Sequence, residues 1–125
     1  MTNRARTIAA AFMTLTASPA LAQAPDGGEQ VYVQVCQACH MADARGGAGA
    51  ATIPALASNP RMAVAGYPIT MILKGRGAMP PLADLLTPAQ IAAVTGYVRT
   101  HFGNTYPAAV TQDDVARLTT PKSAR

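Results

Sequence analysis

The two cysteines of this chain stand three positions apart, and a histidine follows the second one directly. They are Cys36, Cys39 and His40, in the stretch VCQACH. A helix places residues i, i+3 and i+4 on one face, so the three side chains would point at the same object. Two thiols can bond to the edge of a porphyrin while the adjacent imidazole reaches the iron from one side. The motif therefore predicts one covalently attached haem c.

Three other kinds of site use the same residue types. A redox-active disulfide would use C-x-x-C beside a βαβ pattern, which this sequence lacks. A zinc site needs four ligands, and the distant His101 could be the fourth, but the spacing fits no common zinc finger. A purely structural disulfide between Cys36 and Cys39 is the third alternative. An export signal and a downstream methionine favour haem over all three.

The downstream methionine is Met79, in the segment GRGAMPP. Glycines and prolines flank it, and no helical stripe of apolar residues includes its side chain. Met62 and Met71 fall in or near an expected helix, where core packing is the usual role of methionine. His101 lies near the end of a helix that should pack against the motif helix, far from the opposite face of the haem. We therefore predict His40 and Met79 as the two axial ligands of the iron.

Helices are the elements that the sequence predicts around these residues. Hydrophobic spacing and the placement of Gly and Pro indicate helices over residues 28–40, 68–74, 88–102 and 111–118. Thr87 and Gln90 form a capping box with Pro88 between them, and Thr111 and Asp114 form another. Glycine-rich loops are expected over residues 41–59 and 75–82. Since no strand-like alternation is present, we expect an all-α fold.

The N-terminal segment, residues 1–22, has the features of an export signal. Arg4 and Arg6 precede an apolar run over residues 8–15, and a small-x-small cleavage site ends at Ala22. The apolar run is well short of the roughly 20 residues that a bilayer span needs. We therefore expect cleavage after Ala22, no stable membrane span in the mature chain, and location in the periplasm.

Composition narrows the possible partners. Loss of the two signal-peptide arginines lowers the formal net charge from +4 to +2, and no basic run alternates with aromatic residues, so we expect no nucleic acid partner. The chain has no Trp, four Tyr and two Phe among 125 residues, so large apolar side chains are scarce. A small fold of this composition would gain stability from enclosing a large, flat, apolar cofactor.

Over residues 28–103 the chain resembles the class I c-type cytochromes. The resemblance is carried by C-x-x-C-H at the end of an N-terminal helix, P-x-L at Pro54 and Leu56, the segment GRGAMP, and an aromatic-bearing C-terminal helix. The stretches NPR, GAMPPL and YVRTHFGN are similar to the mono-haem subunits and domains that accompany bacterial periplasmic dehydrogenases. Class II cytochromes do not fit, because their motif lies near the C-terminus.

The resemblance implies a small all-α class I cytochrome c fold, with helices around one covalently bound haem. It implies that the carbonyl of Pro54 accepts a hydrogen bond from Nδ1 of His40 and so orients the ring. It also implies a crossing of the two terminal helices at Gly28, Tyr32, Val94 and Tyr97. The distal wall near Tyr67 is where this chain departs from the family, because the helix before Lys74 is about a turn short.

The expected organisation is a signal peptide over 1–22, a haem domain over 23–103 and an extension over 104–125 with a short helix and a polar tail. The extension either docks a dehydrogenase through Val115 and Leu118 or simply caps the fold. The two basic residues before the methionine loop, Lys74 and Arg76, either rim the exposed haem edge or are only solvated.

Histidine and methionine fill both axial positions of an iron, which leaves outer-sphere electron transfer as the expected function. We expect a periplasmic mono-haem cytochrome, not an enzyme, that passes single electrons from a dehydrogenase toward an oxidase or another cytochrome. The alternatives are a freely diffusing carrier to a terminal oxidase, a haem sensor or enzyme with a labile Met79, and a small zinc or disulfide module.

Overall fold

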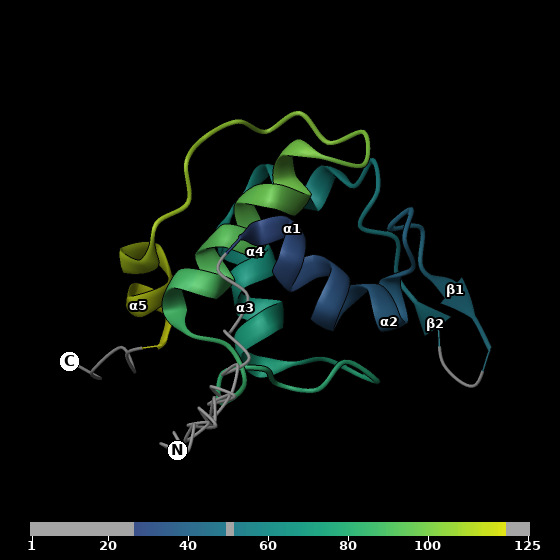
Figure 1. Cartoon of the computed structure of the whole chain (residues 1–125), viewed down its shortest axis with the longest axis horizontal. Coiled ribbons are helices and arrows are strands. Elements are labelled where there is room, and N and C mark those ends of the chain that lie inside the picture. The colour runs from purple at the N-terminus through teal and green to yellow at the C-terminus, as the bar shows by residue number, and fades with distance from the viewer. Residues whose placement is uncertain (1–26, 50–51, 120–125) are drawn as a thin grey trace, which may run out of the picture.

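The computed structural model describes residues 27–49 and 52–119, so the expected export signal lies outside the described residues (Figure 1). The helical elements are α1 (Gly28–Val31), a π-helical turn η1 (Tyr32–Cys36), α2 (Gln37–His40), a 3-10 turn η2 (Pro60–Ala63), α3 (Gly66–Lys74), α4 (Pro88–Thr100) and α5 (Gln112–Thr119). The prediction of a mostly helical chain is confirmed. Of the helices described, none is both long enough and apolar enough to cross a membrane.

One small β-hairpin departs from the all-α expectation. β1 (Gly47–Ala48) pairs antiparallel with β2 (Thr52–Ile53), and it lies beside α2 at one end of the molecule (Figure 1). Each strand is two residues long. Alternation of apolar and polar residues needs a window of about four residues to be visible, so this hairpin leaves no periodic signal in the sequence.

The motif helix packs against α4 at a glycine. A Cβ atom on Gly28 would lie 2.2 Å from the carbonyl oxygen of Ala93 and 2.8 Å from Cβ of Tyr97, so only glycine allows this approach. The ring of Tyr32 is buried, with its centroid 5.9 Å from that of Tyr97. The crossing implied by the resemblance is confirmed at these residues, and Val94 lies buried in the same core.

The best-predicted element is α4. Thr87 Oγ1 accepts a hydrogen bond from the backbone nitrogen of Gln90 at 3.2 Å, and Gln90 Oε1 accepts one from the backbone nitrogen of Thr87 at 2.8 Å. The helix ends at Thr100, two residues before the predicted end, because His101 is extended, with a φ of -121° and a ψ of 176°, and Phe102 follows with a positive φ of 57°. The Phe102 ring nevertheless packs on Tyr32, with the centroids 4.8 Å apart.

The start of α3 and the turn η2 differ from the prediction. α3 begins at Gly66, two residues before Pro68, and ends as expected at Lys74, before Gly75, which has a φ of 66°. The turn η2 was not predicted. Its N-cap is Asn59, whose Oδ1 accepts from the backbone nitrogen of Arg61 at 3.0 Å. Asparagine followed by proline is a start signal for a helical turn, and the sequence contained it.

The C-terminal segment returns along the molecule and places α5 against α3 and α4 (Figure 1). The predicted capping box is present, since Thr111 Oγ1 accepts from the backbone nitrogen of Asp114 at 3.3 Å and Asp114 accepts from that of Thr111 at 2.8 Å. Val115 is fully buried in the common core, and Leu118 is 39% exposed. Of the two alternatives for the extension, docking through Val115 is contradicted, because the fold itself covers that side chain.

Candidate functional site

A cavity of about 790 Å³ lies between the motif helix, the loop after it, α3, the methionine loop and α4. All the predicted site residues line it: Cys36, Cys39, His40, Pro54 and Met79. Most of the remaining wall is aliphatic or thioether, including Leu56, Met62, Ile72, Leu82, Val94 and Val98. The structure thus brings residues from distant parts of the chain to one apolar cavity.

His40 ends α2 and is buried at the cavity wall. Its Nδ1 lies 3.1 Å from the carbonyl oxygen of Pro54, the contact that the resemblance implies. A carbonyl can only accept, so Nδ1 carries the proton and Nε2 keeps its lone pair. Burial lowers the pKa of His40, and the hydrogen bond to Pro54 partly opposes that effect. A neutral imidazole with a free Nε2 is the form that binds a metal.

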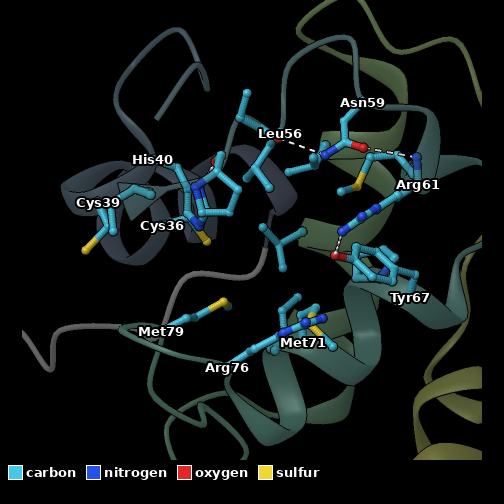
Figure 2. Close-up of a pocket in the computed structure, with 18 of the residues that line it drawn as sticks. Cys36, Cys39, His40, Leu56, Asn59, Arg61, Tyr67, Met71, Arg76 and Met79 are labelled. Atoms are coloured by element: carbon cyan, nitrogen blue, oxygen red, sulfur yellow. Dashed lines mark hydrogen bonds between the residues drawn. The ribbon is translucent and has the colours of Figure 1, made fainter. Parts of the chain in front are cut away.

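The two motif thiols differ in their surroundings. Cys36 is partly buried and Cys39 is exposed, and both are free thiols. Burial raises the pKa of Cys36 to about 11, with a smaller contribution from Cys39. Figure 2 shows the sulfur of Cys36 beside His40 and the sulfur of Cys39 turned outward. Cys36 and His40 therefore point in the same direction, as expected, while Cys39 lies at the edge of the cavity.

Met79 lies across the cavity from His40, with its sulfur directed inward (Figure 2). Two backbone hydrogen bonds close its loop: Arg76 N donates to Met79 O at 2.9 Å, and Met79 N donates to Arg76 O at 3.1 Å. A Cβ atom on Gly75 would lie 2.4 Å from the Met79 carbonyl oxygen, so the glycine is required there. Two other methionines line the same cavity, and of these Met71 comes from α3.

The alternative ligand His101 lies elsewhere. It is exposed, its ring stacks on Tyr97 with the centroids 4.0 Å apart, and it is absent from the lining of the cavity. Within residues 27–49 and 52–119, no group of three or more His, Cys, Asp or Glu residues could hold a metal ion. The geometry does not support the zinc alternative among these residues.

Cationic and hydroxyl groups also line the cavity, and of these Arg61 and Thr95 were not selected from the sequence. Arg61 Nη1 donates to the hydroxyl of Tyr67 at 3.1 Å, and its guanidinium carbon lies 5.6 Å from that ring's centroid (Figure 2). Arg76 and Lys74 are both exposed, but of the two Arg76 alone lines the cavity. Arg61 is the last residue of the NPR stretch, but the resemblance gave it no role, so its place at the cavity was not predicted. Thr95 lies four residues after Ile91 on the inward stripe of α4, and that spacing could have identified it.

These residues fit a bound haem. The walls are apolar, and an imidazole and a thioether, which are both iron ligands, face each other across the cavity. The hydroxyl of Thr95 is buried. Among the buried side-chain polar atoms in the described ranges, it alone has no hydrogen-bond partner. Buried polar groups are almost always satisfied, so an acceptor inside the cavity is expected. Arg61 and Arg76 would complement the carboxylates of a porphyrin.

This fold and cavity are of the kind found in c-type cytochromes, a class of proteins that carry electrons on haem c. Residues 23–98 match the family described as cytochrome C oxidase, cbb3-type, subunit III, and the chain belongs to that family. The chain is also 33% identical to each of two curated proteins over an alignment of 105 positions. That alignment covers 73% of this chain and 22% of each relative. Both are named alcohol dehydrogenase (quinone), cytochrome c subunit, one from Gluconacetobacter polyoxogenes and one from Komagataeibacter europaeus. The chain thus matches about a fifth of those relatives.

Proposed function

We propose that this chain is a mono-haem class I cytochrome of the periplasm that receives single electrons from a dehydrogenase and passes them toward the respiratory chain. In this proposal Cys36 and Cys39 would hold the haem covalently, and His40 and Met79 would supply the two ligands of its iron. The main support for this proposal is the position of two potential iron ligands: the side chains of His40 and Met79 line opposite sides of one apolar cavity (Figure 2).

The dehydrogenase partner is proposed from the relatives. Two curated proteins that resemble this chain are cytochrome c subunits of quinone alcohol dehydrogenases. Because this chain matches only part of them, the partner's substrate need not be an alcohol, and we propose the class of partner alone. The acceptor would be an oxidase or another cytochrome, and the chain itself would transform no substrate.

The residues around the cavity have distinct roles in this proposal. When bound, the haem supplies a one-electron couple of its iron. His40 would bind through Nε2, with its ring held by the Pro54 carbonyl. The soft thioether of Met79 would favour the ferrous state and raise the potential. The closed loop at Arg76 and Gly75 would keep that sulfur in place in both oxidation states.

Two methionines of the same cavity allow a matched test of the ligand assignment. The ferric protein should show the weak long-wavelength absorption of sulfur bound to iron. Met79→Ala should abolish that band and let the ferrous protein bind carbon monoxide, whereas Met71→Ala should leave both properties unchanged. If Met71→Ala removes the band and Met79→Ala does not, the assignment of Met79 is wrong.

A second candidate, an electron carrier to a terminal oxidase, is favoured by the description of the matched family as an oxidase subunit. The two candidates differ in the complex that the protein joins. Affinity capture of the loaded protein from periplasm and solubilised membranes, followed by mass spectrometry, should recover a dehydrogenase catalytic subunit, and that dehydrogenase should reduce the purified protein with its substrate. Recovery of an oxidase core subunit without any dehydrogenase would favour the second candidate.

A further inference from the structure

Arg99 is a buried cation on α4. Its side chain is 3% exposed, and it donates three hydrogen bonds to backbone carbonyl oxygens. Nε donates to Met62 at 2.8 Å, Nη2 to Ala63 at 3.2 Å, and Nη1 to Ala108 at 2.7 Å. These acceptors belong to the turn η2 and to the segment that leads to α5. The guanidinium is therefore held rigidly, but by neutral groups.

No carboxylate neutralises this charge within the described part of the chain. The ion pairs found there are Arg45 with Asp43 and Arg117 with Asp114, both at the surface. Buried arginine is normally paired with an acid, because moving a charge out of water is costly. A guanidinium is a permanent cation, so Arg99 places a full positive charge in the interior.

The charge lies directly behind the cavity wall. Met62, whose carbonyl accepts from Arg99, lines the cavity, and so does Val98, the residue before Arg99. Thr95, one helical turn earlier on the same face of α4, also lines it. A buried charge at this position acts through protein rather than through bulk water, so mobile ions screen it weakly.

We propose that Arg99 raises the reduction potential of the haem in this cavity by favouring the reduced state electrostatically. The inference rests on the proposed haem site. Reduction removes one unit of positive charge from the iron, so a fixed neighbouring cation stabilises the reduced form relative to the oxidised one. Neutralising Arg99 should lower the equilibrium constant for reduction about three- to tenfold, where tenfold corresponds to about 59 mV for a one-electron couple.

A purely structural role of Arg99 makes a different prediction, and a set of variants of the loaded protein separates the two. Arg99→Gln and Arg99→Met remove the charge, while Arg99→Lys keeps the charge and loses most of the hydrogen bonds. Arg117→Gln, at a side chain that is 69% exposed, is the control for a change of net charge alone. Spectroscopic redox titration measures the potential of each variant, and denaturant unfolding measures its stability.

The inference requires that the potential follows the charge and not the stability. Either neutral variant that loads haem should show the three- to tenfold decrease, and Arg99→Lys and Arg117→Gln should stay within twofold of the wild type, although Arg99→Lys is destabilised. Equal shifts in the lysine and neutral variants, or no shift in the neutral ones, would overturn it while leaving the proposed function intact. A wild-type protein without a one-electron couple would overturn the proposed function as well.

Discussion

Gly28→Ala tests the helix crossing that supports the motif. The added Cβ would meet Ala93 O at 2.2 Å and Tyr97 Cβ at 2.8 Å, and both atoms belong to α4. Neither can rotate away, so α1 must move outward or its first turn must unwind. Forced overpacking of this kind costs about 1–3 kcal/mol. That range exceeds the gain of about 0.5–1 kcal/mol that alanine brings to a helix over glycine.

The same helix offers a matched control. Gly96 lies within α4, and a Cβ atom there would have no neighbour within 4 Å. Gly96→Ala should therefore stabilise the protein by about 0.5–1 kcal/mol, since it gains helix propensity without a clash. The two substitutions make the same chemical change and should shift stability in opposite directions.

Thermal unfolding of the haem-loaded protein, followed by far-ultraviolet circular dichroism, measures both effects. For a domain of 60–100 residues, a change of 1 kcal/mol shifts Tm by about 4–8 °C. We expect a clear decrease for Gly28→Ala and a small increase for Gly96→Ala, with the haem spectrum retained in both. A Gly28→Ala protein as stable as the wild type would refute the account of the crossing.

Three further predictions concern the C-terminal segment and the cavity. Val115→Ala should lower the free energy of unfolding by about 1.5–3 kcal/mol, because the Val115 side chain is fully buried. The rate of reduction by a dehydrogenase should stay unchanged at temperatures where the domain is folded. A variant as stable as the wild type but reduced more slowly would contradict this prediction. The pKa of Asp114 is lowered by a hydrogen bond from the backbone of Thr111 and, to a smaller extent, by one from its side chain. The ionised carboxylate therefore stabilises the folded protein at pH values above the unfolded pKa, and this stabilisation is lost as pH falls through the lower folded pKa. The stability difference between wild type and Asp114→Asn should therefore be constant near neutral pH and shrink in acid, as unfolding curves across pH would show. Thr95→Val should destabilise the loaded protein by about 0.5–1.5 kcal/mol, since its hydroxyl gains a partner in the cavity; a more stable variant would mean that the hydroxyl has none.

Features encoded by neighbouring residues were predictable from the sequence. The capping boxes at Thr87 and Thr111 were found because cap and partner are three positions apart. The end of α3 was found because Gly75 supplies the left-handed conformation that follows a helix. The motif and Met79 were selected for the same reason, since each is identified by its immediate neighbours. That these residues line one cavity is a result of the fold.

Features that depend on contacts between distant segments were not predictable. A basic residue near a helix end is usually solvated, but the turn η2 and the return of residues 104–111 over α4 bury Arg99. Val115 sits on a short helix whose pattern fits either docking or burial, and its packing against α3 and α4 decides for burial. The π-helical turn η1, which precedes α2, corresponds to no residue pattern that the sequence analysis could use.

The central claim is that a single haem is bonded to Cys36 and Cys39 of an exported chain. Intact-mass spectrometry of the denatured protein tests this claim most directly. The protein is produced with its export signal in a host that matures c-type cytochromes, denatured, extracted with acid-acetone and weighed intact. We predict a coloured polypeptide that begins at Gln23 and carries the added mass of one haem, and a Cys36→Ala, Cys39→Ala double variant that loses it. A colourless wild-type chain with the mass of the bare polypeptide would contradict the account.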